Sequence, residues 1–401
     1  MELYKWYKSH PEWAEKIAAV LDAGFYKRPK DELSELVAKQ LYGEFFERSI
    51  TRMERYSACA FAHFLTYGLR LKEREVYEFE AFDLGNIFHA SLERYSKRLE
   101  KEKKDWTDVD PEMQKLYVED CVNKAITDYE NSVLFSSRRN EHMIARMKRV
   151  VERTVWALTE QISKGDFKTY AYEMRFGNGK IDRVDTCVDG EEVYVKVVDY
   201  KSGTMAFDVS ALFHGLQLQL MVYMNAAVDV VKRHYPSKEV IPSGVFYYHI
   251  QDPFVSKPGE KSTVENEILK KLIPDGMISL DRESLYHLDH TEYKESLAIP
   301  VKKTKDNALG KYSKVASAED FGTMMEYAEK KVEQLHREIL EGNVKAMPYR
   351  MGEKTGCDYC KYKQICGFDT RIEGYEYKDI HALSDEEAIA AMKKELYAKG
   401  E

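Results

Sequence analysis

The chain has 401 residues, 44% of them hydrophobic, which is enough to fill the core of one large domain with appendages or of two domains. Its formal net charge of -8 excludes a surface that is positive throughout, so any contact with nucleic acid has to be local. No uncharged apolar stretch is long enough to span a bilayer and the first residues lack the pattern of a signal peptide, so we expect a cytoplasmic protein.

The predicted elements change from helices to strands along the chain. Helical periodicity dominates residues 1 to about 165, where Ser49 or Thr51 can cap a helix over 52–69 and Gly85 opens a helix over 85–104. Three β-rich runs follow at 168–176, 179–188 and 191–200, and the turn signals GNG and DGE join them into an antiparallel meander.

The second half of the chain completes an α/β pattern. A long helix is expected over 208–235, and an aromatic strand over 244–253 ends at Pro253. The remaining residues are expected to be helical or irregular, with a charged terminal helix over 384–400. Strands, a helix and another strand, wrapped in helices, predict a central sheet flanked by helices.

An acid and a lysine stand at the end of the third β-rich run, in VDYKSG (198–203). Alternate strand residues share a face, so Asp199 and Lys201 end an otherwise apolar face, and the hairpin near DGEE brings Asp182 close to Asp199. Two carboxylates at strand ends form a hard-oxygen site of the kind that binds Mg²⁺ or Mn²⁺. The alternative is a surface ion pair at a sheet edge, which an isolated D-x-K pattern favours.

The residues around this pair favour phosphodiester hydrolysis. A metal ion lowers the pKa of a bound water and neutralises charge in the transition state, and Lys201 can hold that water beside the phosphate. Gln219 and Tyr223 are spaced i, i+4 on a helical face, and Gly85 and His89 form G-x-x-x-H. Each signal alone is typical of packed or surface residues. In chain order, G-x-x-x-H, G-x-I-D, D-Y-K and Q-x-x-x-Y match the motif series of the RecB-like branch of the PD-(D/E)XK nucleases.

Six cysteines are too few for a disulfide scaffold in a chain of this length, and three of them fall within ten residues. They form the spacing C-x2-C-x5-C at Cys357, Cys360 and Cys366. Cys59, in ERYSACAFAHF, is the best candidate for a fourth ligand, because Cys121 and Cys187 lie in segments without a matching context. Such a site would staple the front of the chain to its end. Zinc and an iron–sulfur cluster both remain open from the spacing.

Six stretches together resemble the C-terminal nuclease domain of the AddB subunit of bacterial AddAB helicase–nucleases. They are SITRMERYSACAFAHFLTYGLRLKERE, LGNIFHASLE, GKIDRVD, VVDYKSG, LQLQLMVYM and PYRMGEKTGCDYCKYKQICGFD. The resemblance runs from about residue 45 to 370. It implies a PD-(D/E)XK, restriction-endonuclease-like core with a mixed sheet, and a [4Fe-4S] cluster held by Cys59, Cys357, Cys360 and Cys366.

The resemblance also implies roles for the motif residues. Asp182 and Asp199 would bind the catalytic Mg²⁺ or Mn²⁺, with His89 and the carbonyl of Tyr200 as further ligands. Lys201 would serve the attacking water. Gln219 and Tyr223 would support the site or touch the DNA backbone. The implied domains are a helical lead-in over 1–45, a nuclease domain over 46–380 with its sheet core at about 168–255, and a terminal helix over 381–401.

In that family the domain degrades single-stranded DNA ends delivered by the partner subunit AddA during double-strand-break repair. The family's subunit is far longer, so this chain is expected to be an excised domain or a truncated homologue, and recognition of a recombination hotspot is not carried over. Only RFGN separates the strand around Glu173 from GKIDRVD, where the resemblance implies a longer insertion, through either a deletion or an omission of residues. Glu173 resembles an acidic position near such sites.

Two alternatives stay open. One is a stand-alone relative similar to the CRISPR spacer-acquisition nucleases, which also carry four cysteines and these motifs. The other is a non-catalytic, cluster-bound scaffold that binds DNA, which loss of Asp182, Asp199 or Lys201 would favour; all three are present.

Overall fold

The computed structural model describes residues 2–7, 10–24, 32–43, 49–72, 81–129, 138–177, 179–256, 262–292 and 294–397. The chain divides into two compact units. The smaller unit comprises Met1–Glu73 and Val332–Ala382, and the larger unit comprises Arg74–Lys331 and Leu383–Glu401. The predicted domain boundary at residues 45–46 lies outside the described residues.

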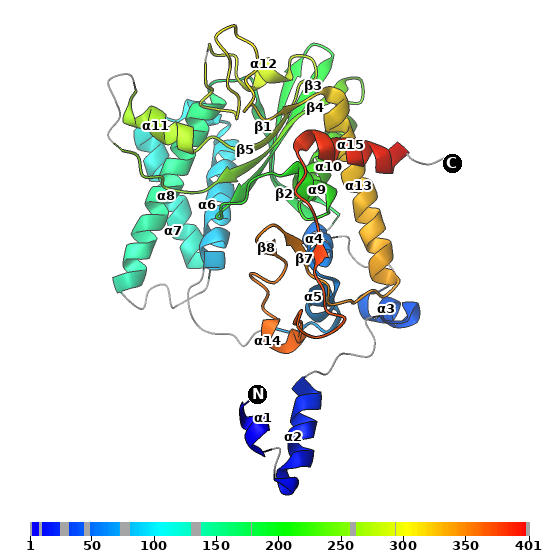
Figure 1. Cartoon of the computed structure of the whole chain (residues 1–401). Coiled ribbons are helices and arrows are strands. Elements are labelled where there is room, and N and C mark those ends of the chain that lie inside the picture. The colour runs from blue at the N-terminus through cyan, green and yellow to red at the C-terminus, as the bar shows by residue number, and fades with distance from the viewer. Residues whose placement is uncertain are drawn as a thin grey trace. The chain divides into compact units, whose positions relative to one another are not determined.

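A six-stranded mixed sheet forms the centre of the larger unit (Figure 1). The strand order in space follows the chain, and the only parallel pairs among the described strands of this sheet are β3 with β4 and β5 with β6. The strands are β1 (Lys168–Phe176), β2 (Gly179–Asp189), β3 (Glu192–Lys201), β4 (Glu239–His249), β5 (Asp275–Ser279) and β6 (Val315–Ala316).

Helices cover both faces of this sheet (Figure 1). Helices α6, α7 and α8 share a hydrophobic core with strand residues such as Tyr194, Val198 and Phe246, whereas α10 packs on β3 and β4. Helix α13 begins in this unit and continues into the smaller one. The helices are α6 (Ala81–Glu102), the short helix η2 (Trp106–Asp108), α7 (Pro111–Asp128), α8 (Arg138–Ile162), α9 (Val209–Phe213), α10 (Gln219–His234), α11 (Val264–Lys271), α12 (Ser284–Leu288), α13 (Ala318–Leu340) and α15 (Asp385–Tyr397).

Tight turns fix the register of the first three strands. Phe176 pairs with Gly179 across the first hairpin, and the second hairpin turns at Gly190. Gly177 and Gly190 have φ of 50° and 51°, in the left-handed region where glycine carries no steric penalty. The predicted antiparallel meander is confirmed, and the short RFGN connection closes a hairpin directly instead of carrying another strand.

Three predicted elements are wrong in extent. The single helix expected over 208–235 is divided into α9 and α10, because Gly215 takes φ of 75° and ends the helical path. Helix α6 begins at Ala81, so Gly85 lies inside it and does not open it. The chain after residue 255 is not only helical or irregular, since β5 and β6 extend the sheet beyond the predicted core.

The smaller unit combines short helices with a small sheet. Ser49 stands at the N-cap position of α4, although its side chain makes no capping hydrogen bond. No helix in the described part of the chain is long and apolar enough to cross a membrane. The elements are α1 (Glu2–Tyr7), α2 (Pro11–Gly24), α3 (Glu35–Tyr42), α4 (Ile50–Ala58), α5 (Ala60–His63), the π-helix η1 (Phe64–Gly68), α14 (Lys363–Cys366), and the strands β7 (Tyr349–Met351), β8 (Lys354–Thr355) and β9 (Lys378–Asp379) in the order β8-β7-β9.

Candidate functional site

Two aspartates occupy the same level of the sheet on β2 and β3. Arg183 pairs with Val198, so Asp182 and Asp199 come next in the register, on the opposite face from Arg183. The side chain of Asp199 is 4% exposed and that of Asp182 is 12% exposed. Beyond them, β3 ends at Lys201, so the strand delivers a buried acid and a lysine to the same edge of the core.

A chain of polar contacts joins β3 to the first turns of α10. The Lys201 ammonium lies 2.6 Å from Asp199 Oδ2 and donates a hydrogen bond of 2.8 Å to Gln219 Oε1. The Gln219 amide nitrogen donates to Asp199 Oδ1 at 2.8 Å and to the Tyr223 hydroxyl at 2.9 Å. Gln219 therefore holds the acid and the lysine with opposite ends of one amide, and the i, i+4 spacing places Tyr223 behind it.

Helix α6 supplies a histidine to the other aspartate. His89 Nδ1 lies 3.4 Å from Asp182 Oδ2, which also accepts the backbone N–H of Tyr200 at 2.8 Å. A Cβ on Gly85, one helical turn before His89, would lie 3.2 Å from the Ser202 hydroxyl. The glycine thus allows α6 to approach the end of β3 closely, which accounts physically for the G-x-x-x-H spacing.

Glu173 joins this group, although the motifs give it little weight. Ligand atoms of His89, Glu173 and Asp182 all lie within 4.8 Å of one another. Glu173 is a non-glycine residue with φ of 50°, a conformation that costs roughly 1–3 kcal/mol and recurs at functional sites. The signal that identifies it is the hairpin register: counting from the Phe176–Gly179 pair places Glu173 opposite Asp182.

Burial and like charge perturb the titration of this group. Burial, together with the negative charge of Asp182, raises the pKa of Asp199 to about 6, and Lys201 only partly offsets these effects. Burial lowers the pKa of His89, but its contact with Asp182 and the charge of Asp199 outweigh burial, so the net direction is upward. Both shifts indicate a local excess of negative charge that a cation would neutralise.

The donor set suits a hard divalent cation. Three carboxylates and one imidazole offer oxygen and nitrogen ligands. Asp199 Oδ2 and Glu173 Oε2 are buried without a well-formed hydrogen bond, and each faces a lysine, Lys201 and Lys180 respectively. Buried carboxylate oxygens that lack hydrogen bonds are available to a metal ion, so the residues fit the cation that the sequence motifs predict.

Four cysteines line a separate cavity of about 420 Å³ within the smaller unit. Cys59 lies between α4 and α5, and the other three follow β8. Burial raises the pKa of Cys357 to about 11, and Cys59 and the two remaining thiols add to that shift. A Cβ on Gly356 would lie 2.7 Å from the carbonyl oxygen of Ala58, so glycine there permits the two cysteine segments to meet.

The structure thus brings together the predicted motif residues in two groups. His89, Asp182, Asp199, Lys201, Gln219 and Tyr223 belong to the larger unit, and Cys59, Cys357, Cys360 and Cys366 to the smaller one. Tyr200 contributes its N–H to Asp182, whereas the role of its carbonyl as a ligand stays a prediction. Cys121 lies in the core beside α6–α8 and not at the cysteine cavity.

Comparison with known proteins identifies relatives over nearly the whole chain. Three of them are named as the AddB-type subunit of an ATP-dependent helicase/deoxyribonuclease. The protein from Lachnoclostridium phytofermentans is 38% identical over 393 residues, covering 94% of this chain and 34% of the relative. Those from Alkaliphilus metalliredigens and Thermoanaerobacter sp. strain X514 are 34% and 33% identical, covering 99% and 100% of this chain but only 36% and 37% of their own lengths.

The chain therefore spans about a third of the length of the curated relatives that it matches. These names confirm the resemblance to the AddB subunit. The family described as the PD-(D/E)XK nuclease superfamily matches residues 47–367, which include the meander, both aspartates and all four clustered cysteines. The chain belongs to the PD-(D/E)XK nuclease superfamily.

Proposed function

We propose that the chain is the nuclease domain of an AddB-type subunit and hydrolyses phosphodiester bonds of DNA with the help of Mg²⁺ or Mn²⁺. The observation that carries the proposal is the convergence of His89, Glu173 and Asp182 beside the Asp199–Lys201 pair. A surface ion pair, the alternative for an isolated D-x-K pattern, does not account for an acid that is 4% exposed on its side chain.

The residues divide into those that hold the cation and those that act on water and DNA. Asp182, Asp199, His89 and Glu173 would hold the metal ion, with the carbonyl of Tyr200 as a further ligand. The bound ion would lower the pKa of water and offset charge that develops on the phosphate. These ligands keep the carboxylates together despite the repulsion that raises the pKa of Asp199.

Lys201 is the residue that we assign to the attacking water and the phosphate. Its ammonium is oriented by Asp199 and by Gln219 Oε1, so two acceptors fix a side chain that would otherwise sample many rotamers. A fixed ammonium can place positive charge where the phosphate gains negative charge in the transition state. Gln219 and Tyr223 are positioning residues in this scheme, because they hold Asp199 and Lys201.

We propose that Cys59, Cys357, Cys360 and Cys366 hold a [4Fe-4S] cluster that staples the two segments of the smaller unit. Four thiolates around one zinc ion would bring the sulfurs to about 3.8 Å from one another, given Zn–S bonds of about 2.3 Å. Among the described residues, ligand groups with all atoms within 4.8 Å occur at two places, and neither is this one. The wider spacing supports a larger group than a single ion.

The substrate and partner follow from the names of the relatives, which are helicase and deoxyribonuclease subunits. We propose single-stranded DNA ends as the substrate, an AddA-type helicase–nuclease subunit as the partner, and the cytoplasm as the location. The stand-alone nuclease and the non-catalytic scaffold predict, respectively, full activity without a partner and no activity at all.

A cleavage assay tests the site directly. Single-stranded and duplex DNA ends are incubated with the chain in Mg²⁺, in Mn²⁺ and in chelator, using wild type, Asp182→Asn and Lys201→Met, with Lys232→Met on the exposed side of α10 as the matched control. We expect metal-dependent cleavage that falls at least about 100-fold in both site variants and is unchanged in the control. Metal-dependent cleavage that survives Lys201→Met would overturn the assignment.

A further inference from the structure

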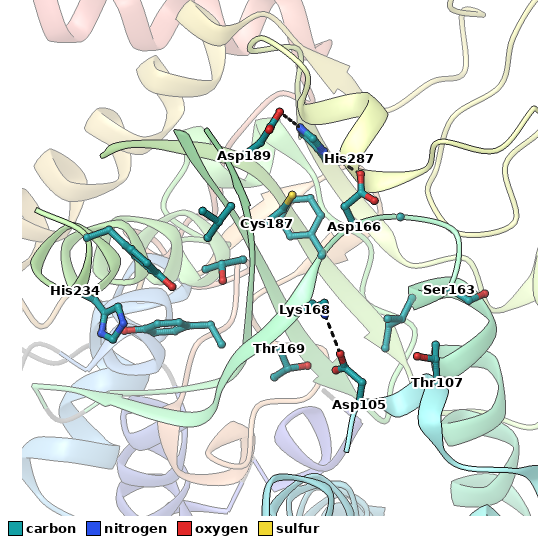
Figure 2. A pocket seen from close by; sticks show the side chains of 17 residues that line it. Asp105, Thr107, Ser163, Asp166, Lys168, Thr169, Cys187, Asp189, His234 and His287 are labelled. Carbon is teal, nitrogen blue, oxygen red and sulfur yellow. Dashed lines mark hydrogen bonds and ion pairs between the residues drawn. The ribbon is translucent and has the colours of Figure 1, made fainter. Parts of the chain in front are cut away.

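A second polar cluster lies on β2 at a distance from the nuclease residues. Cys187 is five residues beyond Asp182, or about 17 Å along an extended strand, and its side chain points to the opposite face. It lines a cavity of about 1180 Å³ with residues from the loop before β1 and from α12 (Figure 2). The motifs of the sequence assign no function to Cys187.

Three different segments contribute ligand-type atoms to this cluster. Atoms of Asp166, Cys187 and His287 lie within 4.8 Å of one another. His287 Nδ1 lies 3.0 Å from Asp166 Oδ2, and His287 Nε2 lies 3.6 Å from Asp189 Oδ2. Figure 2 shows the imidazole between these two carboxylates, and His290 Nδ1 approaches Asp166 Oδ1 at 3.4 Å.

The burial of this cluster points to a missing cation. The His287 side chain is 8% exposed, and its Nε2 is buried without a hydrogen-bond partner. A buried imidazole nitrogen without a partner is unfavourable, whereas coordination would satisfy it. Burial and the charges of Asp166 and Asp189 raise the pKa of Cys187 to about 11, so the site repels a thiolate unless positive charge is present.

We propose that Asp166, Cys187 and His287 form a structural metal site for Zn²⁺, with Asp189 as the fourth ligand. A thiolate and an imidazole select zinc over Mg²⁺, and carboxylates complete many zinc ligand sets. The bound ion would join the loop before β1, the end of the β2–β3 hairpin and α12, which are separate in the sequence. This inference does not depend on the proposed nuclease function.

Zinc content and cobalt substitution test the site. The purified full chain is compared with Cys187→Ser and with Cys121→Ser, a buried cysteine outside both ligand groups. Wild type and Cys121→Ser should hold one zinc equivalent more than Cys187→Ser. Co²⁺ added to zinc-depleted protein should give a thiolate-to-cobalt absorption band that is lost only in Cys187→Ser. Differences between variants cancel any metal in the four-cysteine cavity.

Asp166→Ala provides a second variant that leaves the core intact, because Asp166 is exposed and lies in a loop. It should weaken Zn²⁺ binding by more than the roughly 10–100-fold that outer-shell changes cause, with an unchanged circular dichroism spectrum. Equal zinc content in wild type and Cys187→Ser, or an unchanged Zn²⁺ affinity in Asp166→Ala, would overturn the proposal. In that case the cluster is a histidine held by aspartates alone.

Discussion

Two buried aspartates on neighbouring strands are expected to respond in opposite ways to the same substitution. Asp199→Asn should abolish cleavage and also stabilise the metal-free chain, because the ionised Asp199 is unfavourable where it lies. Its pKa is about 6 in the folded chain against an ordinary 3.8. That difference corresponds to about 3 kcal/mol at neutral pH, which is the upper limit of the expected gain in the free energy of unfolding.

The pH dependence gives the sign of this effect. Between pH 3.8 and about 6 the folded wild type binds a proton at Asp199 that the unfolded chain does not, so wild-type stability rises as the pH falls through this range. The advantage of Asp199→Asn should therefore be full above about pH 6 and disappear below about pH 4. Mg²⁺ should reduce the advantage at neutral pH, since it stabilises only the chain that retains the carboxylate.

Asp185→Asn is the matched control on β2. Burial raises the pKa of Asp185, but Arg183 and Lys196 outweigh burial and lower it. Arg183 donates to Asp185 at 2.6 Å, and Lys196 lies 3.0 Å from its other oxygen. Neutralising this acid leaves two buried cations without their anion, so we expect a loss of about 3–5 kcal/mol.

Urea unfolding in chelator, followed by the fluorescence of Trp106, measures both variants, because Trp106 is 2% exposed in the core of the larger unit. The reasoning predicts a higher midpoint for Asp199→Asn and a lower one for Asp185→Asn. A lower midpoint for Asp199→Asn than for wild type at pH 7.5 would refute it, since the carboxylate would then be a net stabilising group in the absence of metal.

Three further predictions concern positioning and the cysteine site. Gln219→Leu removes hydrogen bonds to two charged groups, so the maximal cleavage rate should fall about 10–100-fold with little change in DNA affinity, measured by single-turnover kinetics; an unchanged rate would contradict its role. Gly85→Ala should raise stability by about 1 kcal/mol and slow cleavage roughly two- to fivefold, and Ser202→Gly in the same chain should restore the rate. Cys366→Ser should lose iron and its visible absorption in an anaerobic preparation and expose the smaller unit to protease; a full complement of iron would contradict the staple.

Local rules predict the meander and its acids because tight hairpins leave few choices. Once Gly177 and Gly190 set the turns, strand alternation places Asp182 beside Asp199. The same rule identifies Glu173 opposite Asp182, but only if the register is counted from the turn. The positive φ of Glu173 has no signature in its residue type, so its conformation could not be predicted.

Long-range packing accounts for what the sequence leaves out. The division between α9 and α10 depends on Gly215 taking a left-handed conformation, whereas the surrounding apolar pattern is continuous. Strand β5 is five residues long, too short for its periodicity to stand out, and it forms because β4 offers a pairing edge. The site at Cys187 requires the tertiary approach of α12, which is about a hundred residues away in the chain.

The division at Gly215 also sets the direction of an electric field. Because α10 starts anew at Gln219, the positive end of its dipole, roughly half an elementary charge, lies where Gln219 bridges Lys201 and Asp199. Lys232, Arg233 and His234 occupy the last turn and complement the negative end. An uninterrupted helix would put Gln219 in its middle, where the field along the axis is weak. The glycine thus gives the site a fixed positive potential that neither a titrating side chain nor a dissociating ion has to supply.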